Sequence, residues 1–166
     1  MTVEQKINHL VTRYTKLCGT NDPFKIVEML NIHLIIEPLG NASGYYRCMK
    51  RIKFIFLNEN IMENEASAKV VMAHELGHAL LHRIENCCFM SHHTLLLTSH
   101  IEREANRFAA ELLITDDMLK EFTGCTVEQF CSCTGYPKEL IELRIKERAY
   151  EYKGKHPNII CRERRI

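Results

Sequence analysis

Apolar residues recur at helical spacing in several stretches of the chain, and these stretches predict most of its secondary structure. Over residues 3–17, Ile7 and Tyr14 mark one apolar face, and a turn-forming stretch then breaks the pattern. Asp22 and Pro23 next suit the N-cap and the first position of a helix, where proline needs no amide hydrogen. Helices are predicted over residues 3–17, 23–30, 65–83, 101–114, 115–121, 127–133 and 138–150.

Three short stretches between the second and third of these helices have the composition of β-strands. Residues 33–37, 44–48 and 53–57 contain β-branched or aromatic side chains, and turn-forming or basic residues separate them. We expect a small antiparallel sheet and, because the strands precede most of the helices, an α+β fold. We divide the chain into a domain over residues 1–122 and a helical C-terminal extension over residues 123–166, packed on the same unit.

The helix predicted over residues 65–83 is apolar in nearly every direction, which indicates a buried central helix. It nevertheless contains His74, Glu75 and His78, and Gly77 suggests close approach by another backbone or by a substrate. Histidines four residues apart share one helix face and can reach the same ion, while Glu75, offset by about 100°, is placed as the general base. Because burying these groups without partners costs several kcal/mol, we predict one catalytic Zn²⁺ here.

A catalytic zinc ion normally has three protein ligands and one open position, so a third ligand is needed. His82 continues the same helical face but lies a further turn along, and we interpret it as a supporting or packing residue. On the following helix Glu102 shares the apolar inward face, whereas Glu104 falls on the opposite side, where we expect solvent and a pair with Arg107. The predicted site therefore has the metal ligands His74, His78 and Glu102, with Asn106 and His82 as supporting residues.

Composition and charge exclude several other classes of protein. Hydrophobic residues at 46% and charged residues at 26% are ordinary for a globular protein, and a net charge of +1 provides no general attraction to nucleic acid or membranes. The basic end from Arg144 onward is interrupted by glutamates and contains no DNA-reading motif, so we expect a solvated helix and tail without direct nucleic-acid binding. Without a signal-peptide pattern or a membrane-spanning apolar run, we expect a cytoplasmic protein with no membrane partner.

The chain contains eight cysteines, which we interpret as thiols because no export signal accompanies them. Cys125, Cys131 and Cys133 lie close together in the sequence, and a second metal site there is the alternative. The group lacks the C-x-x-C pair of common zinc sites, so we favour ordinary thiols.

Two segments together resemble the ImmA/IrrE metallopeptidase family. Residues 74–82 read His-Glu-Leu-Gly-His-Ala-Leu-Leu-His, residues 102–115 read Glu-Arg-Glu-Ala-Asn-Arg-Phe-Ala-Ala-Glu-Leu-Leu-Ile-Thr, and the likeness extends over roughly residues 20–120. Many members have a proline near the position of Thr115, a departure that concerns a helix boundary and not the chemistry. The resemblance implies a zincin-like, gluzincin-type fold with the same three ligands and with Glu75 as the catalytic base.

The resemblance is greater to the shorter ImmA type, since the chain lacks a long additional sensor domain. Such members cleave a helix-turn-helix repressor of a mobile element or prophage and so derepress its genes. We therefore expect a zinc-dependent endopeptidase with this kind of protein substrate; the alternative is a non-catalytic zinc-containing module that inactivates a repressor by binding it. A donor to the tetrahedral oxyanion is also needed, and the sequence leaves four candidates: Tyr45, Tyr46, His92 and His93.

Overall fold

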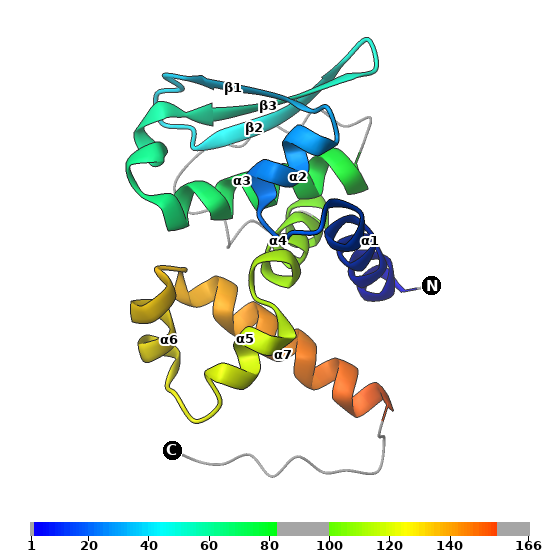
Figure 1. Cartoon of the computed structure of the whole chain (residues 1–166), viewed down its shortest axis with the longest axis vertical. Coiled ribbons are helices and arrows are strands. Elements are labelled where there is room, and N and C mark those ends of the chain that lie inside the picture. The colour runs from blue at the N-terminus through cyan, green and yellow to red at the C-terminus, as the bar shows by residue number, and fades with distance from the viewer. Residues whose placement is uncertain (1, 83–99, 156–166) are drawn as a thin grey trace.

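The computed structural model describes residues 2–82 and 100–155 and shows a mixed α and β architecture (Figure 1). The helices are α1 (Val3–Cys18), α2 (Pro23–Met29), α3 (Glu65–Leu81), α4 (His100–Leu113), α5 (Asp116–Glu121), α6 (Val127–Thr134) and α7 (Lys138–Lys155). The strands are β1 (His33–Glu37), β2 (Gly44–Met49) and β3 (Ile52–Asn58), followed by a 3-10 helix, η1 (Glu59–Glu63). The predicted α+β class is confirmed, and η1 is the one described element that was not predicted, because so short a helix has no periodic signal.

The three strands form a mixed sheet in the order β1-β3-β2, so the predicted antiparallel sheet is wrong for one strand pair. β2 and β3 form an antiparallel hairpin, whereas β1 and β3 are parallel. Chain direction reverses from each strand to the next along the sequence. Since β3 inserts between β1 and β2, it lies beside a strand that runs in its own direction.

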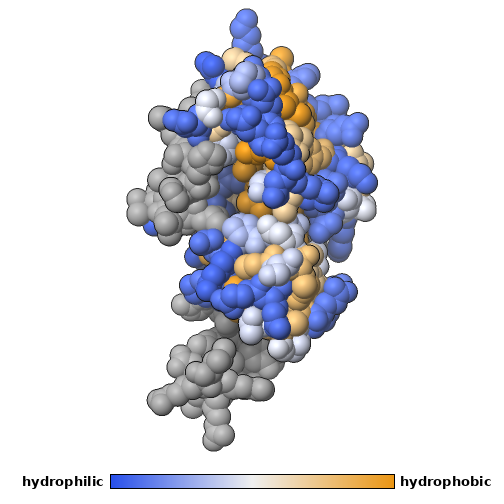
Figure 2. All heavy atoms as spheres, turned by 90° about the vertical axis from the view of Figure 1, so that its left-hand side faces the viewer, coloured by the Kyte–Doolittle hydropathy of each residue, from blue (hydrophilic) through white to orange (hydrophobic). Residues whose placement is uncertain are grey.

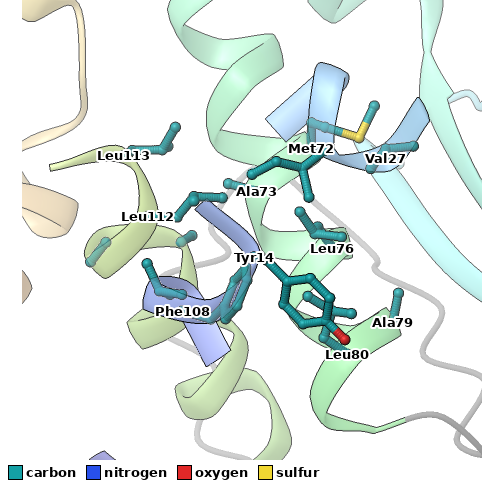
Figure 3. Close-up of a cluster of buried hydrophobic side chains, with 14 of the residues drawn as sticks. Tyr14, Val27, Met72, Ala73, Leu76, Ala79, Leu80, Phe108, Leu112 and Leu113 are labelled. Atoms are coloured by element: carbon teal, nitrogen blue, oxygen red, sulfur yellow. The ribbon is translucent and has the colours of Figure 1, made fainter. Parts of the chain in front are cut away.

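α3 lies between the sheet and α4 and forms the centre of the hydrophobic core (Figure 1). Residues 72–80 are all buried, which confirms the interpretation of this segment as a buried central helix. Figure 3 shows the apolar cluster where α1, α2, α3 and α4 meet, with Tyr14, Val27, Met72, Ala73, Leu76, Ala79, Leu80, Phe108, Leu112 and Leu113 labelled.

Gly77 marks a point of close approach between α3 and α4. A Cβ atom added at Gly77 would lie 3.2 Å from the Cα atom of Ala105 and 3.3 Å from the Cβ atom of Phe108. The missing side chain thus lets the two backbones pack closely, which offsets the unfavourable helix propensity of glycine. Of the two explanations drawn from sequence, the structure supports approach by another backbone.

Arg144 joins α7 to the end of α4, and its predicted place on a solvated face is wrong. The side chain is 2% exposed. Its guanidinium donates to the carbonyl oxygen of Ile114 at 2.9 Å and forms ion pairs with Glu111 at 2.8 Å and Asp116 at 2.9 Å. Sequence periodicity within α7 could not reveal these partners, because they belong to α4 and its continuation. The division of the chain after residue 122 stays a prediction.

The outer surface carries mixed hydrophilic and apolar side chains. Figure 2 shows one face on which hydrophilic side chains predominate and apolar ones gather in patches between them. Within the described residues, no helix combines the length and apolar character needed to cross a membrane.

Candidate metal centre

The structure brings together the three residues predicted as metal ligands. His74 and His78 lie one turn apart on α3, with their Nε2 atoms 3.0 Å from each other. Glu102, in the first turn of α4, places one carboxylate oxygen 3.2 Å from His74 Nε2 and the other 3.5 Å from His78 Nε2. Among residues 2–82 and 100–155, this is the group of histidine, cysteine and acidic side chains whose arrangement could hold a metal ion.

The separations between these donor atoms fit a single tetrahedral ion. Ligands about 2.0–2.2 Å from a tetrahedral zinc ion lie roughly 3.3–3.6 Å from one another, close to the values between Glu102 and the two histidines. Two imidazole nitrogens and a carboxylate are also a common ligand set of catalytic zinc sites. The residues present therefore fit such an ion and leave a position open for a further ligand.

Asn106 orients the first of these histidines. Its Oδ1 atom accepts a hydrogen bond of 2.8 Å from Nδ1 of His74, and both side chains are buried. Because the proton lies on Nδ1, the Nε2 lone pair of His74 is directed at the centre of the cluster. Asn106 lies one turn after Glu102 on α4, and its contact with His74 is of the kind predicted for a supporting residue.

Glu75 is fully buried beside the triad. No described side chain donates a hydrogen bond to its carboxylate oxygens. Burial raises the pKa of Glu75 well above its ordinary value, the negative charge of Glu102 raises it further, and the backbone amide of Tyr46 has the opposite effect. A buried carboxylate with a raised pKa is suited to accept and return a proton.

The pKa values of the two remaining ligand candidates are both lowered, but for different reasons. Burial lowers the pKa of His78, more than the hydrogen bond to Glu102 raises it. For Glu102, burial acts to raise the pKa, but the hydrogen bonds and charges of His74 and His78 outweigh it and lower the pKa to about 2. A neutral imidazole beside an ionised carboxylate is the protonation state in which both bind a metal.

Glu104 is buried, so the expectation that it is solvated and pairs with Arg107 is wrong. Its carboxylate oxygens lie 3.4 Å from Nε2 of His82 and 2.9 Å from Nε2 of His100, while Arg107 pairs with Glu4 at 2.7 Å. His82, the residue after α3, covers this side of α4. The periodicity of α4 alone could not show that the end of another helix shields its polar face. His82 thus has a supporting contact, to Glu104.

The four predicted oxyanion donors differ in where the structure places them. Tyr46 is fully buried and packs on the side of the sheet that faces α3, where its backbone influences Glu75. Tyr45 lies on the opposite side by strand alternation and stacks on Phe56, with ring centroids 4.5 Å apart. This position argues against Tyr45. His92 and His93 lie outside the described residues, and the identity of the donor stays a prediction.

β2 is an edge strand of the sheet that the described residues form, and it runs past the site. The amide of Asn58 donates to the carbonyl oxygen of Ser43 at 2.9 Å. With the observed register, this bond directs the backbone groups of Tyr45 towards β3 and those of Gly44 and Tyr46 away from β3. The influence of the Tyr46 amide on Glu75 agrees with this alternation. An edge strand of the described sheet thus lies beside the candidate base.

The cysteines form no further metal site in the part of the chain that the structure describes. Cys125 and Cys133 are exposed thiols and Cys131 is a partly buried one. They do not converge with other potential ligands in these residues. The interpretation of this group as ordinary thiols stays a prediction.

Comparison with known proteins connects this geometry to a family. The sequence profile described as IrrE N-terminal-like domain, a peptidase family, matches residues 27–129. An uncharacterized immunity region protein 2 of Bacillus phage phi105 is 36% identical over 141 residues, which cover 83% of this chain and 88% of the phage protein. Metallopeptidase ImmA of Bacillus subtilis (strain 168) is 30% identical over 147 residues, 85% of each protein. The profile match and these two relatives, together with the buried His-His-Glu cluster, show that the chain belongs to the ImmA/IrrE family of metallopeptidases.

Proposed function

We propose that the protein is a zinc-dependent endopeptidase that cleaves a helix-turn-helix repressor of a mobile element or prophage. The observation that supports it most is the convergence of His74, His78 and Glu102 beside the buried carboxylate of Glu75. A purely structural zinc site is closed by four protein ligands and needs no adjacent base. Here three ligands, with a buried base on the helix that carries two of them, suit hydrolysis.

Zinc held by these three side chains would polarise the peptide carbonyl and acidify the attacking water. Glu75 accepts a proton from this water as its oxygen bonds to the carbonyl carbon, and later delivers the proton to the leaving amine as the C–N bond breaks. Asn106 holds the ring of His74 in place through its 2.8 Å hydrogen bond. Burial keeps the basicity of Glu75 high, despite the opposing effect of the Tyr46 backbone amide.

The edge of β2 is our proposed binding surface for the scissile segment. An extended peptide could lie along this edge strand, where the backbone groups of Gly44 point outward. Since the Tyr46 amide lies close enough to Glu75 to affect its pKa, a peptide bound there lies beside the base. Strand pairing uses backbone groups, so it requires an unfolded or extended segment of the substrate.

A repressor is our proposed substrate on the strength of the family resemblance. The phage relative is named as an immunity region protein and the bacterial relative as metallopeptidase ImmA. Both names agree with the action on a repressor that the resemblance to the ImmA type implies. Shape and charge of the site alone do not select one protein substrate among others.

Glu75→Gln separates catalysis from inactivation by binding alone. We would incubate the zinc-loaded wild type and variant with the helix-turn-helix repressor encoded in the same element, and follow cleavage by mass spectrometry and repressor binding by calorimetry. The variant should retain zinc and bind the repressor but lose cleavage by a factor of about 10² or more, because the general base is gone. If repressor inactivation survives in the variant, the non-catalytic alternative is correct.

The choice of the third ligand is tested with a matched pair of substitutions. Glu102→Ala should lose most bound zinc, whereas Glu104→Ala removes a carboxylate of the same helix and should retain it, as measured by metal analysis after gel filtration. The pair controls for the loss of negative charge near the site. Zinc retained by Glu102→Ala and lost by Glu104→Ala would show that our ligand assignment is wrong.

A further inference from the structure

The turn between β2 and β3 has an unusual sequence for its shape. Lys50 and Arg51 are the two loop residues, and both adopt left-handed backbone conformations, with φ of 49° and 68°. A two-residue hairpin with positive φ at both positions is a type I′ turn, for which Asn-Gly is strongly preferred. Side chains with a Cβ are strained there. Strain of this kind is frequent where a binding site requires particular side chains.

Arg51 lines a cavity of about 440 Å³ that is separate from the metal centre. The cavity lies between α1, the start of β1, the hairpin turn and the end of α3. Tyr14, Ile32 and Leu80 provide apolar surface, and each is at most 9% exposed. The size falls within the range typical of pockets for small organic molecules.

The polar side chains of this cavity are biased towards positive charge. His33, Arg51 and Lys53 contribute to the lining, and none of the described residues that line it is acidic. Lys53 donates to the carbonyl oxygen of Ala79 at 2.7 Å, which holds its ammonium group at the C-terminal end of α3. The cavity therefore combines an apolar floor with two permanent cations.

We propose that this cavity binds a small organic anion in which a carboxylate or phosphate is attached to an apolar group. The guanidinium of Arg51 can donate two hydrogen bonds to a pair of oxygens of either anion, and the Tyr14 and Leu80 surface accepts the apolar group. The arrangement also gives a reason for Arg51 in the turn, since glycine there would relieve the strain but remove one of the two cations. Through Lys53 and Ala79, the bound anion lies next to the end of the helix that carries His74 and His78.

The hairpin offers a matched pair of variants for a test. Arg51→Gly removes one of the two cavity cations and relieves the strain at φ 68°, whereas Lys50→Asn relieves the strain at φ 49° without changing the cavity lining. Both should fold at least as stably as the wild type, which thermal unfolding would check. The probes are phenyl phosphate and phenylacetate, with benzyl alcohol and inorganic phosphate as the separate apolar and anionic parts.

Binding of each probe to the zinc-loaded full chain would be measured by calorimetry and located by amide chemical shifts. We expect wild type and Lys50→Asn to bind phenyl phosphate or phenylacetate at millimolar concentrations or better, with shifts at Tyr14 and Leu80. Arg51→Gly should bind at least tenfold more weakly, the loss of about one charge-assisted hydrogen bond. The stronger of the two anions identifies the head group.

Three results would overturn the proposal. The first is no binding of either aromatic anion by the wild type. The second is equal binding by Arg51→Gly, and the third is binding of benzyl alcohol as tight as that of the anions. None of these measurements uses peptidase activity, so they are independent of the proposed function.

Discussion

Substitution of Gly77 by alanine tests whether helix packing determines the geometry of the metal centre. Alanine improves intrinsic helix propensity by about 1 kcal/mol. The new Cβ, however, would lie 3.2 Å from the Cα atom and 3.3 Å from the carbonyl oxygen of Ala105, and 3.3 Å from the Cβ atom of Phe108. These atoms belong to the α4 backbone or lie directly on it, so no flexible side chain can move aside.

Relief of these contacts requires α4 to move away from α3 by a few tenths of an ångström. Overpacking of this kind costs about 1–3 kcal/mol, so after the gain in propensity we expect a net destabilisation of about 0–2 kcal/mol. Glu102 moves with α4, while His74 and His78 stay on α3. Since the donor atoms lie only 3.0–3.5 Å apart, zinc affinity should fall by about tenfold, as for other small displacements of metal ligands.

The free energy of unfolding of the metal-free variant would be measured by urea denaturation, and zinc affinity by competition with a chelator. Ser67→Ala is a control on an exposed position of the same helix. It should gain up to about 0.5 kcal/mol from propensity and leave zinc affinity unchanged. A Gly77→Ala protein that is more stable than the wild type and binds zinc equally well would refute the argument that close packing of α3 on α4 sets the site.

Three further predictions address the base, the orientation of a ligand and the anchoring of α7. Burial raises the folded-state pKa of Glu75 above its ordinary value of 4.5, so the metal-free wild type should lose stability as the pH rises from 4.5 through the raised pKa. Glu75→Gln should lack this loss. Urea denaturation should therefore show equal stability of the two proteins at low pH and a more stable variant at neutral pH. Asn106→Leu should weaken zinc binding by about 10–100-fold in calorimetry, whereas Asn106→Asp retains the acceptor for His74 Nδ1 and should bind nearly as tightly as the wild type. Arg144→Met should destabilise the protein by about 3 kcal/mol, because it leaves the Glu111 carboxylate without its buried cation. Adding Glu111→Met should restore most of the lost stability. An unaffected unfolding midpoint in the single variant would contradict this account.

Local sequence periodicity predicted much of the fold and the first part of the site. The spacing of His74 and His78 on a helix, and the apolar residues on all sides of that helix, follow from neighbours within a few turns. Asp22 and Pro23 likewise mark the start of α2, where the Asp22 side chain accepts a hydrogen bond from the Phe24 amide at 2.9 Å. Such features depend on residues close in sequence, and they were found where expected.

Tertiary structure decided what depends on segments distant in sequence. The pattern of α4 placed Glu102 inward correctly, but it also placed Glu104 in solvent, since nothing in α4 reveals that His82 and the end of α3 cover that side. The predicted solvent exposure of Arg144 is wrong for the same reason, because its carboxylate partners lie on other helices. The sequence also does not predict the order of the strands in the sheet, since the composition of a strand does not indicate which strand lies in the middle. Periodicity reports which residues share a face, whereas burial and polar partners depend on which element packs against that face.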